Sequence, residues 1–333
     1  MNSETVGCGS GNCCCSRDSV NGIININKPA GLTSFDVVAR IRRMTRCKRT
    51  GHAGTLDPDA TGVLLVCLGQ ATRMSALLGE CRKTYVAEVQ LGASTDTYDA
   101  SGRVTSTGDY SGVDVSRLLS ALAMFVGDIQ QVPPMYSALK FRGKPLYQLA
   151  RAGVQMELAS RPIHVYRLDL VSWTPPLFKI EVECGKGTYV RSLAHDIGKE
   201  LGCGAHLKTL VRTRCGGFGI NDSIGLDELE EDVKTGEWLD HLHPIDSAAL
   251  HLPAVILNDE KARMARSGRF LDLGDARQSD GSAADLLPTN SPCRAYDERG
   301  DFIAILEYKV EERSWHPYRV FSTGATDTCE SLS

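Results

Sequence analysis

The sequence predicts an α+β protein with a small second domain that is rich in strands. The chain has 333 residues, about twice the usual length of one domain. Strand and helix patterns both occur in the first two-thirds, whereas strand patterns predominate near the C-terminus. Hydrophobic residues make up 42% and charged residues 23%, values typical of a globular protein, which exclude a coiled coil or a fully disordered chain.

Composition and pattern divide the chain into four parts. Residues 1–20 are mostly Gly, Ser and Cys with almost no apolar anchor, so we expect a disordered extension. The first domain should span 21–247 and the second 248–322, with a hinge near His243 and Pro244 and a tail over 323–333. Within the first domain, residues 131–153 mix Pro, aromatic and basic residues, which predicts an excursion from the core.

The elements of the first half follow from local patterns. Ile23–Ile26 forms a short strand that Lys28-Pro29-Ala30-Gly31 ends. Thr33 or Ser34 can cap the next helix. That helix would bury Val37, Val38, Ile41 and Met44. A glycine-rich loop at Gly51–Gly62 should precede a buried strand at Val63–Leu68, and Thr84–Leu91 alternates as a strand does.

Helices and strands also alternate in the remainder. Helices are expected at Ser116–Phe125 and Thr188–Leu201, and a pair of strands at Pro162–Val171 and Phe178–Cys184. The second domain should contain strands at Leu252–Leu257, Phe302–Tyr308 and Tyr318–Phe321, with a mobile loop over Asp272–Pro292.

Charge is unevenly distributed. Residues 1–220 contain 26 Lys and Arg against 18 Asp and Glu, whereas residues 221–333 contain 11 against 23. Such a chain can bind a polyanion on one side, although charge also varies between domains without function. No apolar run is long enough to span a membrane, and the N-terminus lacks the features of a secretory signal. We therefore expect a cytoplasmic protein whose 12 cysteines are reduced thiols.

The loop Gly51–Gly62 is the sharpest candidate for chemistry. It lacks the Gly-Lys-Ser/Thr ending of a phosphate-binding loop. It also lacks the final glutamate of a calcium loop, because that position is Leu68. An ordinary turn capped by an aspartate is the alternative for this loop alone. The thiols Cys8, Cys13, Cys14 and Cys15 lack the paired spacing of a zinc site, so no metal is expected.

Six segments together resemble the TruB family of tRNA pseudouridine synthases. They are, in chain order, Gly22–Gly31, Gly51–Gly62, Lys83-Thr84-Tyr85, Gln131–Lys140, Gly187-Thr188-Tyr189-Val190-Arg191 and Gly202–Leu210. The resemblance covers about residues 22–322. It implies a pseudouridine synthase fold with a large mixed central sheet, a small C-terminal RNA-binding domain of the PUA type, and an insertion at 131–153 that closes over RNA.

The resemblance also implies a reaction. Family members isomerise uridine 55 in the TΨC loop of tRNA: the base is flipped out, its bond from N1 to the ribose is broken, and it is reattached through C5. No cofactor or metal takes part. The expected partner is therefore the TΨC stem-loop of tRNA, without a membrane or an obligate protein partner, and nothing in the sequence requires more than a monomer.

Three residues match the family's catalytic positions. Asp57 corresponds to the essential carboxylate, which can act as a nucleophile or base once it is ionised. Arg191 corresponds to its partner, and an adjacent Arg lowers the pKa of a carboxylate. Tyr85 corresponds to the tyrosine that stacks on the target base and helps to remove the C5 proton.

Further residues match substrate-contacting positions. His52 would contact RNA where bases are flipped out, Tyr189 would contact the substrate, and Leu210 would pack beneath the active site. Lys28 belongs to the opening motif and would either bind substrate or support the loop of Asp57. The basic positions expected to contact the RNA backbone are Arg40, Arg42, Arg43, Arg46, Lys140, Arg142 and Lys144.

Two alternatives compete with a stand-alone tRNA enzyme. A non-catalytic RNA-folding factor would bind and remodel the tRNA elbow without needing Asp57, and the two roles could coexist. The guide-RNA-directed branch of the same superfamily works within a larger complex, and the tRNA-type architecture of this chain favours the stand-alone enzyme.

Overall fold

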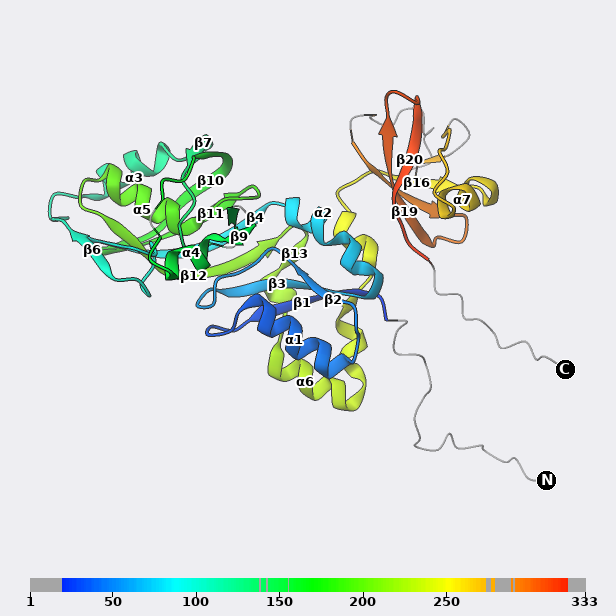
Figure 1. Ribbon diagram of the computed structural model, residues 1–333, viewed down its shortest axis with the longest axis horizontal. Coiled ribbons are helices and arrows are strands. Elements are labelled where there is room, and N and C mark those ends of the chain that lie inside the picture. Colours follow the sequence, from blue (N-terminus) through cyan, green and yellow to red (C-terminus); the bar gives the residue numbers. More distant parts are fainter. Residues whose placement is uncertain are drawn as a thin grey trace.

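A large mixed sheet and a smaller C-terminal sheet form the framework of the protein (Figure 1). The computed structural model describes residues 20–273 except 138, 142 and 155, together with 277, 278, 289 and 291–322. The Cys-rich extension before residue 20, most of the expected loop over 272–292 and the tail after residue 322 lie outside the described residues.

The large sheet has the strand order β14-β1-β3-β12-β4-β11-β10-β7, with β2, β13 and β15 paired beside this path. The bounds are β14 Ile224–Gly225, β1 Gly22–Lys28, β3 Thr61–Leu68, β12 Ala205–Cys215, β4 Lys83–Leu91, β11 Leu177–Cys184, β10 Arg161–Thr174, β7 Gly127–Gln131, β2 Thr50–Ala53, β13 Phe218–Gly219 and β15 Leu242–His243. The pairs β1–β14 and β3–β12 are parallel and the other pairs are antiparallel. The expected mixed central sheet is confirmed.

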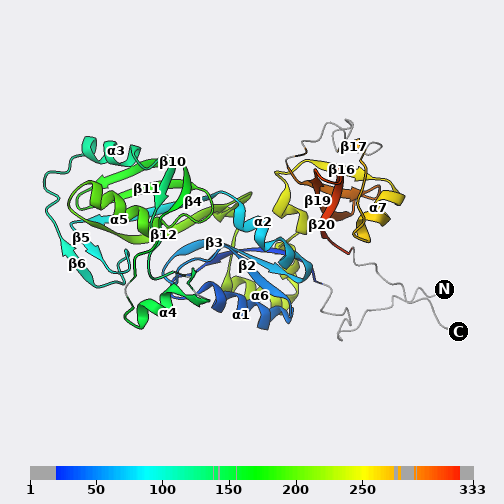
Figure 2. The same ribbon diagram turned by 45° about the horizontal axis from the view of Figure 1, so that its top comes forward.

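Helices cover this sheet and border the cleft described below. They are α1 Ser34–Thr45, α2 Ser75–Glu80, α3 Val115–Ala123, α4 Leu146–Arg151, α5 Val190–Glu200 and α6 Leu226–Thr235. The helix α1 begins as predicted, because the Thr33 side chain accepts a hydrogen bond from the Asp36 N–H and Asp36 caps Thr33 in return. In Figures 1 and 2, α1 and α6 lie side by side against the β1–β3 part of the sheet.

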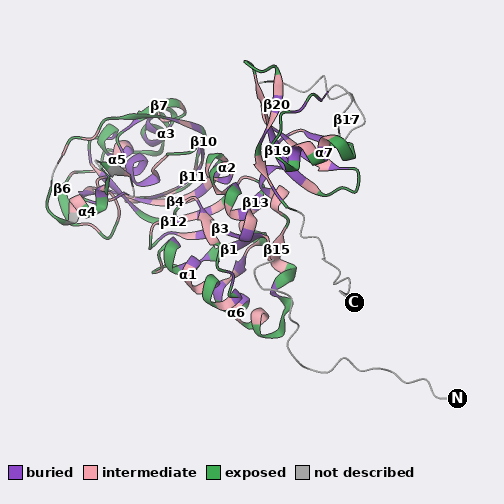
Figure 3. Cartoon of the chain, turned by 45° about the vertical axis from the view of Figure 1, so that its right-hand side comes forward, coloured by how far each residue is buried: buried purple, intermediate pink, exposed green. Residues whose placement is uncertain are grey.

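Two short hairpins lie outside the large sheet. One consists of β5 Ala93–Thr95 and β6 Val104–Thr107, and the other of β8 Lys140–Phe141 and β9 Lys144–Pro145. The second hairpin and α4 form the expected excursion over residues 131–153. Figure 3 shows that α5 is largely buried, whereas α3 and α6 expose their outer faces.

The two halves of the large sheet meet at the parallel contact between β3 and β12. Only two residue pairs make this contact, Thr61 with Val211 and Gly62 with Arg212. Gly62 has φ of +95°, and a Cβ atom at this position would lie 2.2 Å from the Arg212 carbonyl oxygen. Glycine is therefore required both by the backbone conformation and by the close approach of the strands.

The C-terminal sheet has the order β17-β16-β18-β19-β20 and packs against one helix, α7 Asp259–Arg266. Its strands are β17 Arg277–Gln278, β16 Ala254–Leu257, β18 Cys293–Asp297, β19 Phe302–Lys309 and β20 Ser314–Val320. Ile305 and Phe321 are buried in one cluster with Ile23 and Val63 of the large sheet. The Gln70 and Arg73 side chains also donate hydrogen bonds to the carbonyls of Ser322 and Val320.

The chain near His243 and Pro244, where a hinge was expected, is packed against the large sheet. Leu242 and His243 pair with β1, and Ala248 and Ala249 are buried in the cluster shared by the two sheets. Backbone pairing and apolar burial therefore fix this connection.

Other elements differ from the predictions in their extent or were missed. Gly51, His52 and Ala53 form β2 against β3, so the expected loop begins only at Gly54. The strands β12 and β18 and the helices α2, α6 and α7 had not been predicted. Within the described part of the chain, no helix is long and apolar enough to cross a membrane.

The contact at Gly62 makes a stability prediction. Gly62→Ala should lower the free energy of unfolding by more than about 2 kcal/mol, because the methyl group adds a backbone clash to the strain of positive φ. Gly31→Ala is the matched control: Gly31 has φ of +83°, but its Cβ atom would meet nothing within 4 Å. Urea unfolding measures both variants, and equal destabilisation of the two would show that β3 and β12 can separate at little cost.

Candidate active site

A cleft of about 650 Å³ opens beside the β3–β12 contact. Its walls come from the start of α1, the loop Gly54–Ala60, the turn around Thr97–Ser101, the insertion and the middle of β12. A deeper hollow of about 250 Å³ adjoins it, and Asp57, Arg191 and Leu210 line both. Tyr147 of α4 and Phe35 of α1 lie at the cleft, in agreement with the proximity of these helices in Figure 2.

Hydrogen bonds from Lys28, Gly31 and Ser34 hold the loop that carries Asp57. The Ser34 hydroxyl exchanges hydrogen bonds with the backbone N–H and C=O of Leu56, at 2.9 and 3.2 Å. The Pro58 carbonyl accepts hydrogen bonds from the Lys28 ammonium group and the Gly31 N–H, at 2.8 and 2.9 Å. The opening segment of the chain therefore positions the residues on both sides of Asp57.

Arg191 holds the Asp57 carboxylate with two nitrogen atoms. Its Nη2 donates to Asp57 Oδ1 at 3.0 Å, and its Nε lies 2.8 Å from Oδ2. The Arg191 side chain is only 5% exposed, whereas that of Asp57 is 40% exposed because it faces the cleft. Carbonyl oxygens of Thr97 and Tyr136 accept further hydrogen bonds from Arg191, so the guanidinium is rigidly oriented.

The pKa of Asp57 is raised, although an adjacent arginine was expected to lower it. Desolvation raises the pKa of Asp57 above its ordinary value, and the nearby Arg191 opposes that rise without cancelling it. Asp99 lies 3.6 Å from Arg191 Nη1 and also raises the pKa of Asp57. Arg191 therefore favours the ionised form of Asp57, whereas partial desolvation favours the protonated form.

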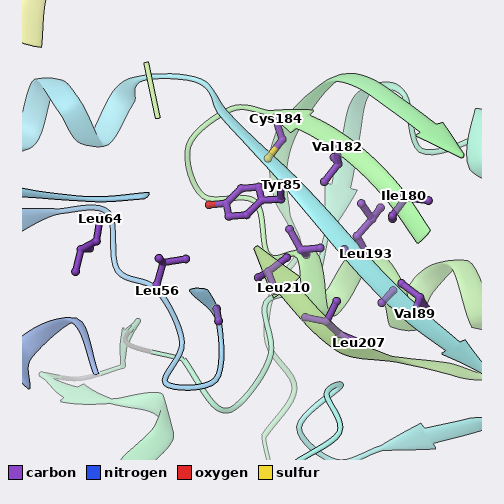
Figure 4. Close-up of a cluster of buried hydrophobic side chains, with 14 of the residues drawn as sticks. Leu56, Leu64, Tyr85, Val89, Ile180, Val182, Cys184, Leu193, Leu207 and Leu210 are labelled. Carbon is purple, nitrogen blue, oxygen red and sulfur yellow. The ribbon is translucent and has the colours of Figure 1, made fainter. Parts of the chain in front are cut away.

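Tyr85 and Leu210 form an apolar floor below the carboxylate. Tyr85 comes from β4 and Leu210 from β12, and each is 8% exposed. Figure 4 shows both within the buried cluster, with the Tyr85 hydroxyl directed toward the segment of Leu56 and Leu64. A flat ring inserted into the cleft would meet an aromatic and an aliphatic surface here.

Tyr189 and His52 line the two adjoining hollows, Tyr189 the smaller one and His52 the larger. The Gln131 side chain accepts a hydrogen bond from the Tyr189 N–H at 2.8 Å and donates one to its carbonyl at 3.1 Å. This clamp fixes Tyr189 at the start of α5, where it lines the deeper hollow. His52 lines the cleft from β2, and desolvation followed by the charge of Arg212 lowers its pKa, which favours neutral imidazole.

Lys28 does not reach the cleft. It is completely buried, and its ammonium group donates to the carbonyls of Pro29, Leu32 and Pro58 at 2.8, 2.6 and 2.8 Å. Of the two roles left open by the sequence, the structure therefore supports loop positioning and not contact with substrate. Desolvation lowers the pKa of Lys28 to about 8.

The predicted basic positions separate into groups. Arg42, Arg43 and Arg46 are exposed on and just after α1. Arg40 instead pairs with Glu230 and Asp227 of α6 at 2.5 and 2.6 Å, so it joins two helices and is not free for phosphate. In the insertion Lys144 is exposed, Lys140 is placed in β8 without a described side chain, and Arg142 lies outside the described residues.

The structure adds three residues that sequence reasoning missed. Asp99 reaches Arg191 from a turn far away in the sequence, and Gln131 clamps Tyr189. Phe35 lines the cleft although it is 69% exposed. A large apolar residue in the first turn of a helix, two positions after the cap Thr33, was the sequence signal for Phe35. In the described part of the chain, no cluster of three His, Cys, Asp or Glu side chains is placed to hold a metal ion.

Comparisons with known proteins identify the family of this chain. Residues 42–190 match the N-terminal domain of the TruB family of pseudouridylate synthases, and residues 191–249 match the C-terminal domain of tRNA pseudouridylate synthase B. A tRNA pseudouridine synthase B from Dehalococcoides mccartyi is 42% identical over 302 residues, 91% of this chain and 97% of the relative. One from Thiobacillus denitrificans is 40% identical over 92% of this chain and 98% of the relative.

Solved structures show the same fold at lower identity. An H/ACA RNP bound to a substrate RNA containing 2′-deoxyuridine includes a chain that is 26% identical, with a TM-score of 0.68 over 91% of this chain and 85% of that one. A Cbf5-Nop10-Gar1 complex gives 29% identity and a TM-score of 0.68 over 86% of this chain and 78% of that one. The chain therefore belongs to the TruB family, whose members are pseudouridine synthases and hence isomerases.

Proposed function

We propose that the protein isomerises uridine to pseudouridine at position 55 in the TΨC loop of tRNA. The observation that carries this proposal is the Asp57 carboxylate, held by Arg191 above the floor of Tyr85 and Leu210. This arrangement pairs a reactive carboxylate with a pocket for one flat base. A paired base is inaccessible inside a helix, so the target base must be flipped out to enter the pocket.

The proposed reaction begins when the ionised Asp57 engages the flipped nucleotide. The bond between N1 and the ribose breaks, the base rotates in the pocket, and C5 forms the new bond to the ribose. The proton on C5 then leaves and N1 gains a proton. Tyr85 and Leu210 would hold the base during its rotation, because apolar contacts constrain a ring without fixing its orientation.

Similarity supports tRNA as the substrate. Relatives named tRNA pseudouridine synthase B are about 40% identical over nearly their whole length. The chains from the H/ACA RNP and the Cbf5 complex are less than 30% identical. The difference favours a stand-alone tRNA enzyme over the guide-RNA-directed branch.

A purely RNA-folding role does not explain the buried Arg191. A protein that only remodels the tRNA elbow has no use for a carboxylate that faces the cleft and is held by a buried guanidinium. We further propose that the C-terminal sheet is a PUA-like domain that adds RNA contacts. Its small size and its position on the core shared with the large sheet fit such an auxiliary unit.

Asp57→Asn should lower turnover by about 10⁴-fold or more, because the amide keeps the shape of the side chain but is a poor nucleophile. The measurement is tritium release from tRNA labelled at uridine C5, with the product mapped to position 55. Binding of tRNA should change little. Asp59→Asn is the matched control, because it makes the same change from carboxylate to amide in the same loop and should retain turnover.

Two results would contradict the function. If wild-type protein binds tRNA tightly but releases no tritium, the folding role becomes the better explanation. If Asp57→Asn retains substantial activity, Asp57 is not the essential carboxylate.

Activity should depend on pH through Asp57. Because burial raises its pKa, protonation should abolish activity at a higher pH than for an ordinary aspartate. Arg191→Met removes the opposing positive charge and should move this acidic limb to still higher pH, whereas Arg191→Lys should leave it near the wild-type position. Single-turnover rates across pH test this, and identical acidic limbs in all three proteins would exclude Asp57 as the titrating group.

Neutralising Arg42, Arg43 and Arg46 together should weaken tRNA binding and flatten its salt dependence. The log–log slope should fall by about one for each phosphate that the protein no longer neutralises. The matched control replaces the same residues with Lys, which keeps their charge and should keep the slope. Filter-binding titrations at several salt concentrations measure it, and an unchanged slope in the neutral variant would place the RNA backbone elsewhere.

A further inference from the structure

A second guanidinium lies beneath the active site, and the proposed reaction gives it no role. Arg212 of β12 is completely buried. Its Nε donates to the Val63 carbonyl at 2.6 Å and its Nη2 to the Gly54 carbonyl at 2.9 Å. Its Nη1 has no hydrogen-bond partner among the described residues. No described carboxylate forms an ion pair with it, in contrast to Arg191.

This arrangement is costly for a purely structural residue. Removing an unpaired positive charge from water costs several kcal/mol, and such charges are normally paired with a carboxylate. Two backbone carbonyls could be satisfied by a neutral donor. The charge and the free Nη1 therefore require an explanation in the surrounding site.

The residue that faces Arg212 across the sheet is Tyr85. The two are directly opposite in the antiparallel pairing of β12 with β4, so their side chains lie on the same face. Both line the deeper hollow. In Figure 4 the Tyr85 hydroxyl points toward the side on which Leu56 and Leu64 lie. The carbonyls that hold the guanidinium belong to Gly54 and Val63, which are close to these leucines in the chain.

We infer that Arg212 is a positioning residue that orients the Tyr85 hydroxyl and stabilises negative charge on its oxygen while the C5 proton is removed. The inference rests on the proposed function. In the step, the C5–H bond breaks and its electron pair restores the C5–C6 double bond. The pair of the C6–N1 double bond moves to N1, which takes up a proton, and the C5 proton moves to the ionised Tyr85 oxygen. The phenol proton has previously left to water, and the newly acquired proton follows it through the open cleft.

Arg212 partly offsets the effect of burial on Tyr85. Burial raises the pKa of Tyr85 and so favours the neutral phenol, and the charge and hydrogen-bonding capacity of Arg212 oppose that rise without cancelling it. Without Arg212 the ionised form would be more strongly disfavoured. Lys83, a second buried cation in the hollow, donates to the carbonyls of Gly79 and Cys81, so its ammonium group is occupied elsewhere.

The test compares tRNA carrying hydrogen or deuterium at uridine C5 in single-turnover reactions. Arg212→Met should lower the rate by about 10²-fold, in the range expected when proton-transfer catalysis is removed. Its C5 isotope effect should exceed that of wild type, because proton removal becomes more rate-limiting. Arg212→Lys, which keeps the charge, should restore part of the rate and bring the isotope effect back toward the wild-type value. Affinity for tRNA should stay within about twofold of wild type.

A double variant separates the proposed role of Arg212 from a merely structural one. If Arg212 acts through Tyr85, adding Arg212→Met to Tyr85→Phe should cause little further decrease in rate. If Arg212 has a structural role that is independent of Tyr85, the two decreases in rate should multiply. Thr213→Val is the control, since Thr213 is the next residue of β12 but lines a separate hollow. If Arg212→Met fails to fold, the isotope effect and pH–rate profile of Arg212→Lys decide between the two roles.

Three outcomes are separable. An unchanged isotope effect together with multiplying rate decreases would overturn the role of Arg212 while wild-type activity still supports the proposed function. A raised isotope effect with non-additive decreases would support the role. Absence of tritium release from wild type would instead remove the proposed function itself.

Discussion

The contact between β3 and β12 determines the geometry of the site, because it joins the two halves of the large sheet through only two residue pairs. Gly62 permits that contact, and the chain just before it is the loop of Asp57. Arg212 sits at the same contact and faces Tyr85 on β4. One close approach of two backbones thus brings together residues that are far apart in the chain.

Two buried guanidiniums serve two different groups in this site. Arg191 is paired with a carboxylate, so much of its charge is neutralised and its main effect is to orient Asp57 and favour its ionised form. Arg212 has only carbonyl partners, so its charge remains available to a developing negative charge nearby. In the proposed reaction, this contrast between a paired and an unpaired cation would separate the step in which Asp57 engages the nucleotide from the step that removes the C5 proton.

Local chemistry made several elements predictable from the sequence. Thr33 caps α1 through its own side chain, and the apolar run of β3 and the alternation of β4 are intrinsic to their residues. By contrast, β12 buries Arg212 and interrupts its alternation with bulges, and the acidic sequence of α6 indicates only a solvated surface until Arg40 pairs with it. These properties depend on partners that are distant in the sequence.

The site also combines residues that the local sequence identifies with residues that only folding brings into place. Asp57, Arg191 and Tyr85 were found through motifs, and the structure places them together. Asp99 lies in none of the six motif segments, and Gln131 opens one of them without any sign of its contact with Tyr189, because folding alone brings these side chains to Arg191 and Tyr189. For Lys28 the motif left two roles open, contact with substrate or support of the loop of Asp57, and its burial favours support of the loop.

The shared core of Ile23, Val63, Ile305 and Phe321 has a geometric consequence. Apolar packing seats the C-terminal sheet directly against the large sheet that carries Asp57. If the C-terminal sheet contacts RNA as proposed, the separation of the two surfaces would favour helical arms whose length places the reactive uridine over Asp57.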